Sequence, residues 1–292
     1  MDAIDRAEAA DGAPRGAAPG PWPRRAVALL GACHPGPTAA VTLLVAGLVV
    51  AAGQDLSGGV LAIAAVLTGQ LSVGWSNDAV DAARDIAAGR GAKPVVAGAV
   101  DARAVATAAL VALALCVPLS LAYGLLAGTV HLVGVAAAWA YNVRLKSTRL
   151  SWLPYAIGFA ALPAFVTLGL PGRPWPAWWI VTAAALVGVG AHLGNVLPDI
   201  EADLATGVRG WPQRLGPGAV RLLLPAPLVA ATVLLAAGRP GAVGGVAVAV
   251  ALVAGIGGSL TGRHRPRVPF AAAVLVAAVD VALLLWQGAA LS

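Results

Sequence analysis

Two short segments hold nearly half of the acidic side chains in this sequence. Only 13 Asp and Glu residues occur among 292 residues, and each of the two segments contains three of them. In both segments an Asn is followed by Asp four and eight residues later; the residues of this pattern are Asn77, Asp81 and Asp85, then Asn195, Asp199 and Asp203. Residues spaced in this way share one face of an α-helix, so the pattern predicts two stripes of oxygen ligands.

Carboxylates stacked at helical spacing repel one another, and a bound cation relieves this repulsion. Oxygen ligands without His or Cys favour Mg²⁺, which one or two carboxylates usually hold together with phosphate oxygens of a substrate. A solvated, salt-bridged helix end would explain one such segment, but two matching segments favour a shared site. The segments therefore predict a Mg²⁺ site that clamps a diphosphate, with Asp78, Asp81, Asp85, Asp199 and Asp203 as metal ligands and catalytic groups. Glu201 lies off the stripe and is expected to be solvated.

The elements that carry these segments are predicted to be membrane-spanning helices. The chain is 59% hydrophobic and 11% charged, and its apolar residues form long blocks. About 20 apolar residues in a helix cross a hydrocarbon core of about 30 Å. We therefore expect an all-α, polytopic membrane protein with about nine transmembrane helices, near residues 36–53, 57–76, 104–122, 124–141, 152–170, 177–197, 220–237, 241–260 and 268–287. The acidic segments follow the second and sixth of these spans.

The basic residues predict how the chain lies in the bilayer. All of the 19 Lys and Arg residues except Arg173 and Arg239 fall before the first span or in alternate loops after it. Because basic loops stay in the cytoplasm, the N-terminus and both acidic segments are expected on the cytoplasmic side of the cell membrane. Anionic lipid headgroups then explain the net charge of +6, and no nucleic-acid partner is expected. Residues 1–23 are expected to form a disordered cytoplasmic tail before a transmembrane domain at 24–292.

The two segments resemble the signatures of the UbiA superfamily of intramembrane prenyltransferases. Residues 77–85 match NDxxDxxxD through Asn77, Asp78, Asp81 and Asp85, and residues 199–203 match DxxxD. Residues 93–98, KPVVAG, are similar to a basic-Pro…Gly segment that follows the first signature in the family. The resemblance, over about residues 24–287, implies a helical barrel around a central cavity, in which the Asp motifs hold Mg²⁺ against the diphosphate of a prenyl donor. Asn195 is added to the site because of the internal symmetry.

A third family pattern, YxxxK, matches less well. After Tyr141, Arg144 comes one residue early and Lys146 one residue late, so either cation could serve the diphosphate. Tyr141 is a candidate for the acceptor pocket, with interfacial anchoring as the alternative. The residues expected to contact the donor or the acceptor are Asn77, Arg90, Lys93, Tyr141, Arg144, Lys146 and Asn195. Arg209 and Arg214 are further candidates for the diphosphate, and Arg149 is assigned to membrane orientation.

The resemblance implies transfer of a prenyl group from a prenyl diphosphate to a small polar or aromatic acceptor, and we expect an aromatic one of quinone-type metabolism. Transfer to a sugar phosphate and an ion-coupled secondary transporter are the alternatives, although transport sites usually lie nearer the bilayer midplane. Asp280, inside the last span, either helps to bind the acceptor or makes a structural hydrogen bond, and the second role is favoured. His131 and His192 are assigned to packing or polar bonding.

Overall fold

The structure, a computed structural model, describes residues 22–89, 91–261 and 268–287. Within these ranges the chain forms helices and turns, and no strand. The helices are α1 (Trp22–Ala32), α2 (Pro35–Ala51), α3 (Leu56–Ala87), α4 (Ala102–Tyr123), α5 (Leu125–Val143), the 3-10 turn η2 (Leu145–Ser147), α6 (Leu153–Leu168), α7 (Trp178–Val196), the 3-10 turn η3 (Leu197–Asp199), α8 (Ile200–Ala205), α9 (Trp211–Leu223), α10 (Pro225–Gly238), α11 (Ala242–Thr261) and α12 (Val268–Trp286). Residues 1–21, most of the predicted tail, lie outside the described residues.

Every predicted span coincides with a helix, and the all-helical, multi-pass fold is confirmed. The exact number of spans stays a prediction. Among the described helices, six are long and apolar enough to cross a membrane alone, and up to eight do so if each bent pair is one span. The bent pairs are α1 with α2, at 67°, and α9 with α10, at 48°. The 16 residues of α6 fall short of a full crossing.

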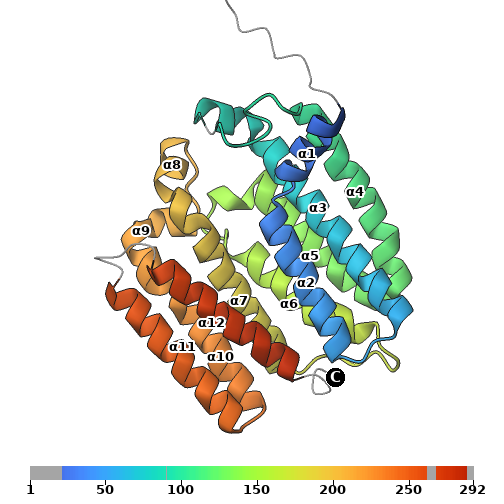
Figure 1. Ribbon diagram of the computed structural model, residues 1–292, viewed down its shortest axis with the longest axis vertical. Helices are drawn as coiled ribbons and strands as arrows, with labels where there is room; N and C mark the ends of the chain where they lie inside the picture. Colours follow the sequence, from blue (N-terminus) through green and yellow to red (C-terminus); the bar gives the residue numbers. More distant parts are fainter. Residues whose placement is uncertain (1–21, 90, 262–267, 288–292) are drawn as a thin grey trace, which may run out of the picture.

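The helices form a ring in which chain neighbours pack side by side. From α2 to α7 each long helix contacts the next, α7 contacts α10, and α12 packs on both α10 and α2. Figure 1 shows α12 returning toward the middle of the molecule, while α1 and α8 lie at the same end of the bundle. Small residues allow the close packing; a methyl group on Gly188 of α7 would overlap the backbone carbonyl of Tyr155 in α6.

Two features of this ring position the acidic segments. Helix α3 continues to Ala87, well past the predicted span end at residue 76, so the first segment lies wholly on one helix. The second segment starts at the end of α7, where a core cluster of Leu193, Ile200 and Leu224 packs α7, α8 and the end of α9 together. Both segments are thus carried by elements that are anchored in the apolar core.

Candidate active site

The three aspartates of the first segment are buried along one side of α3. Asp78 is 3% exposed, Asp81 9% and Asp85 2%. Buried carboxylates are costly unless they are paired and hydrogen-bonded. The charged groups around them therefore determine what this face of α3 can bind.

Lys93 supplies the charge for two of these carboxylates. Its Nζ lies 2.8 Å from Asp78 Oδ1 and 2.7 Å from Asp85 Oδ2. Burial alone would lower the pKa of Lys93, but the hydrogen bonds and charges of the two aspartates outweigh it and raise that pKa overall. Lys93 is therefore firmly cationic, and it folds the loop after α3 back onto the acidic face.

His34 is a partner of Asp78 that the sequence analysis missed. Its Nε2 lies 3.0 Å from Asp78 Oδ1. His34 stands between α1 and α2 in a left-handed conformation, with φ at 55°, and Pro35 begins the next helix. No signal in the sequence links His34 to a residue 44 positions away, since the contact depends on how the bent pair α1 and α2 packs on α3.

Lys146, in η2, pairs with the third carboxylate, that of Asp81. Arg84, one helical turn along α3, also lies 2.6 Å from Asp81 Oδ1. Burial lowers the pKa of Lys146 below its ordinary value, more than Asp81 raises it, and the positive charges of Arg84 and Lys93 lower it further. Arg144 is exposed, and its side chain forms no hydrogen bond or ion pair with another described residue. Of the two cations after Tyr141, the structure places Lys146 at the acidic face.

Asn77 faces a neighbouring helix. Its Nδ2 donates to Asn142 Oδ1 of α5 at 3.0 Å, and Asn142 Nδ2 in turn donates to Ser76 Oγ at 2.7 Å. Asn142 is a second residue that the sequence analysis missed, although it directly follows Tyr141. These amide bonds fix α5, and with it Tyr141, against the first segment.

The second segment is carried by three consecutive elements, whereas the first lies on α3 alone. Asn195 is on α7, Asp199 ends η3 and Asp203 is on α8. Pro198 lacks a backbone N–H, and the chain forms a 3-10 turn there before α8 begins. The shared face of Asn195, Asp199 and Asp203 stays a prediction. Asn195 and Asp199 are exposed. Asp203 is half-buried and accepts a hydrogen bond from Gln213 Nε2 at 2.8 Å.

An aromatic cluster lies between the two segments. The ring of Tyr141 is 5.2 Å from that of Tyr155, and the ring of Tyr155 is 4.9 Å from that of His192. The phenol of Tyr141 hydrogen-bonds to Tyr155 and is close enough to Asp81 and Asp203 to interact with the charge of both. Tyr155 OH also accepts from Asn195 Nδ2 at 3.1 Å. Tyr141 is thus packed between the acidic segments.

His192 joins this cluster to the loops behind the second segment. Its Nε2 is 3.1 Å from Ser151 Oγ, which also accepts the Trp211 backbone N–H at 3.0 Å. The sequence analysis left His192 outside the site, although it precedes Asn195 by a single helical turn. That spacing was the available signal, but Tyr155 and Ser151 could be connected to His192 only through the packing of α6 on α7.

Comparison with known proteins identifies the family. A model of the UbiA prenyltransferase family matches residues 39–269. The chain belongs to this family. It is therefore an intramembrane prenyltransferase, and its acidic segments coincide with the family signatures quoted above.

Single proteins with known sequences or solved structures are also similar to this UbiA-family chain. It is 35% identical over 139 residues to the bacteriochlorophyll synthase 33 kDa chain of Cereibacter sphaeroides, a match that covers 42% of this chain and less than half, 46%, of that relative. The fold is similar to an Archaeoglobus fulgidus UbiA homologue bound to GPP and Mg²⁺, with a TM-score of 0.66, 16% identity and coverage of 88% of this chain and 98% of the other. An apo UbiA homologue from Aeropyrum pernix K1 also has a similar fold, with a TM-score of 0.67, 22% identity and coverage of 84% of this chain and 97% of the other. These solved structures support the helical architecture.

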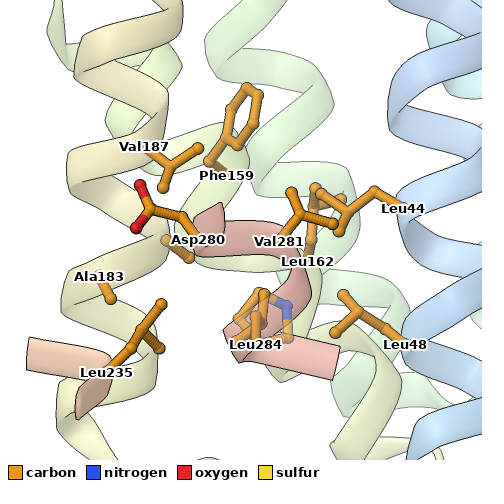
Figure 2. Close-up of a pocket in the computed structure, with 12 residues that line it drawn as sticks. Leu44, Leu48, Phe159, Leu162, Ala183, Val187, Leu235, Asp280, Val281 and Leu284 are labelled. Carbon is orange, nitrogen blue, oxygen red and sulfur yellow. The ribbon is translucent and has the colours of Figure 1, made fainter. Parts of the chain in front are cut away.

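Asp280 of this UbiA-family chain lies away from the acidic segments. It is 1% exposed, and its Oδ1 accepts a hydrogen bond from Thr232 Oγ1 at 2.6 Å, which confirms the expected structural bond. Twelve residues separate it from the start of α12, so it lies about 18 Å along that helix. Figure 2 shows Asp280 among apolar side chains of α6, α7, α10 and α12, around a cavity of about 20 Å³. That volume admits about one water molecule.

Arg90 lies outside the described residues. Within the described ranges the structure therefore brings together Asp78, Asp81, Asp85, Lys93 and Lys146, and places Tyr141 between this group and Asp203. Asn77 hydrogen-bonds to Asn142 of α5 and Asn195 to Tyr155 of α6. Arg144 lies outside this group. The result is a group of charged and polar side chains, called the acidic cluster below, at one end of an apolar ring of helices.

Proposed function

We propose that this chain transfers a prenyl group from a prenyl diphosphate to an aromatic acceptor in a Mg²⁺-dependent reaction at the cytoplasmic face of the cell membrane. The observation that carries the proposal is the set of three buried carboxylates on α3 that are paired with Lys93 and Lys146. The bound GPP and Mg²⁺ of the Archaeoglobus fulgidus homologue support the choice of donor and metal.

The carboxylates fit Mg²⁺ that is bound through a substrate. Within the described residues, no three His, Cys, Asp or Glu side chains are placed to hold an ion by themselves. Mg²⁺ characteristically takes only one or two carboxylates and completes its shell with water and phosphate oxygens. The donors near Tyr141 are carboxylate oxygens of Asp81 and Asp203, and they suit that mode of binding. The candidates are Asp78, Asp81 and Asp85 on one side and Asp199 and Asp203 on the other, and one or two of them would hold each ion directly.

The lysines have two roles in this proposal. In the absence of a diphosphate they pair with Asp78, Asp81 and Asp85. When metal and diphosphate bind, Mg²⁺ supplies positive charge to the carboxylates, and Lys93 and Lys146 can donate to phosphate oxygens instead. Cations placed in advance where the leaving diphosphate gains negative charge lower the barrier to breaking the allylic C–O bond.

The apolar helices and the aromatic cluster would receive the two organic groups. The apolar helices shelter the prenyl chain and keep water from the allylic cation, which water would otherwise consume. Tyr141, Tyr155 and His192 offer aromatic faces between the acidic segments, and these faces support an aromatic acceptor. Quinone-type metabolism is one source of such an acceptor, and the similarity to a bacteriochlorophyll synthase chain adds pigment synthesis as a second pathway to test.

The location of the acidic cluster also distinguishes the proposal from a carrier. The carboxylates lie toward the ends of α3 and α7, and the loops at this end contain most of the basic residues. Under the positive-inside rule this end faces the cytoplasm. Carrier sites are usually formed near the bilayer midplane, where this chain has the single carboxyl of Asp280 among its described residues.

The test is Mg²⁺-dependent pyrophosphate release by the purified protein in lipid, with a panel of prenyl diphosphates and of aromatic and sugar-phosphate acceptors. We expect release to need Mg²⁺, to be lost in Asp81→Ala and to persist in Glu201→Gln, which removes an exposed carboxylate of the second segment. The acceptor that stimulates release names the pathway. Folded protein that binds no prenyl diphosphate but takes up a solute with Mg²⁺ would favour the carrier.

A further inference from the structure

Beyond the acidic cluster, three arginines line one open pocket. The pocket has a volume of about 510 Å³ and is lined by Arg149, Leu204, Arg209, Trp211 and Arg214. Arg149 follows η2, Arg209 precedes α9 and Arg214 is in the first turn of α9. Three segments of the chain thus contribute cationic and apolar groups to one hollow of the size that small ligands occupy.

Specific contacts hold this pocket in shape. Arg214 Nε donates to the Arg209 carbonyl at 2.8 Å, and the Trp211 N–H donates to Ser151 Oγ at 3.0 Å. Gly210 approaches the Lys146 carbonyl so closely that a methyl group there would overlap it. The loop that carries Arg149 and the start of α9 are therefore tied together by backbone contacts, which keep the arginines near one another.

The charge of the pocket is not balanced from within the described part of the chain. No acidic side chain there forms an ion pair with Arg149, Arg209 or Arg214, although Asp203 and Glu201 are close in sequence. Like charges held together repel, so an anion that enters the pocket is favoured. Guanidinium groups recognise carboxylate and phosphate oxygens through paired N–H donors, and Trp211 and Leu204 offer an apolar surface beside them.

We infer that this pocket, defined by Arg149, Arg209 and Arg214, is a binding site for a phosphate or carboxylate group attached to an apolar body. The pocket is distinct from the carboxylate face of α3, but Gln213 connects α9 to Asp203, and Ser151 connects Trp211 to His192. A lipid headgroup and a free anion share the required chemistry. Membrane orientation alone would account for dispersed arginines, but it requires no pocket.

The experiment measures binding to the purified full-length protein in an uncharged detergent, with EDTA present so that no Mg²⁺-dependent site contributes. The probes are inorganic phosphate and dihexanoyl-phosphatidylglycerol, and zwitterionic dihexanoyl-phosphatidylcholine is the reference. The test variants are Arg149→Gln and Arg209→Gln, because their side chains form no hydrogen bond or ion pair with other described residues. Arg103→Gln is the matched control, since it removes an exposed arginine at the same end of the bundle. Thermal unfolding establishes that each variant is folded.

We expect anionic probes to bind more tightly than phosphatidylcholine, and each test substitution to weaken binding about tenfold while Arg103→Gln leaves it unchanged. Binding of phosphate itself, or its competition with phosphatidylglycerol, identifies a free-anion site. Phosphatidylglycerol binding without competition by phosphate identifies a headgroup site. Equal binding of both lipids, an equal loss in Arg103→Gln or no binding by folded protein would overturn the inference. Because Mg²⁺ is absent throughout, each of these outcomes is separate from the fate of the prenyltransferase proposal.

Discussion

The ammonium group of Lys93 lies 2.8 Å from Asp78 Oδ1 and joins the loop after α3 to the buried face of that helix. Because the same group lies 2.7 Å from Asp85 Oδ2, Lys93→Met would remove a counter-charge from two buried carboxylates. Breaking a buried pair from one side costs about 3–5 kcal/mol, and we expect a loss of stability near the lower end because the Lys93 side chain is 22% exposed.

This loss can be measured by chemical unfolding in detergent. A Lys93→Met/Asp78→Asn double variant is the control, since it removes one of the two affected carboxylate charges together with the lysine. It should recover part of the stability. A single Lys93→Met variant as stable as the parent would show that the carboxylates are satisfied without Lys93, and would weaken its assignment as the cation of the acidic cluster.

The lowered pKa of Lys146 predicts that activity falls in alkaline solution. Burial lowers its pKa, so as pH rises Lys146 loses its proton before an ordinary lysine does. The neutral amine can no longer offset the charge of a diphosphate, and kcat/KM for the prenyl donor should fall on the alkaline side. Lys146→Arg keeps its charge throughout this range and should move the alkaline fall to higher pH. An unchanged pH profile in Lys146→Arg would assign the fall to another group.

The features of this fold and site that could be predicted are those that local sequence determines. Long apolar blocks sufficed to locate the long helices α2 to α7 and α10 to α12, but not α8 or most of α9. The four-residue spacing located the aspartates of α3. The turn at Pro198 had a local signal as well, but the symmetry with the first segment hid it. His34 and Asn142 had no such signal, because their contacts with Asp78 and Asn77 join residues 44 and 65 positions apart. The choice of Lys146 over Arg144 depends on the 3-10 turn η2, which residue spacing alone does not specify.

The second segment predicts a contrast between two neighbouring acids. Asp203 is half-buried, accepts a hydrogen bond from Gln213 and interacts with Tyr141, whereas Glu201 is exposed. Asp203→Asn should therefore reduce Mg²⁺-dependent pyrophosphate release by about a hundredfold or more, and Glu201→Gln should change it little. A titration of activity with Mg²⁺ distinguishes the causes, since loss of a ligand raises the Mg²⁺ concentration needed for half-maximal rate. Equal effects of the two substitutions would contradict the assigned roles.

The hydrogen bond between Thr232 and Asp280 predicts an effect on stability that can be separated from catalysis. Thr232→Val removes the donor that satisfies Asp280 Oδ1 in apolar surroundings, and a buried acceptor left without its partner costs about 1–3 kcal/mol. Replacing both groups, in Thr232→Val/Asp280→Leu, removes the unsatisfied oxygen as well, so this double variant should be closer to the parent in thermal stability. Because Asp280 lies about 18 Å along α12 from its start, acceptor turnover should be retained in the double variant. A folded double variant with an increased KM for the acceptor alone would instead place Asp280 in the acceptor pocket.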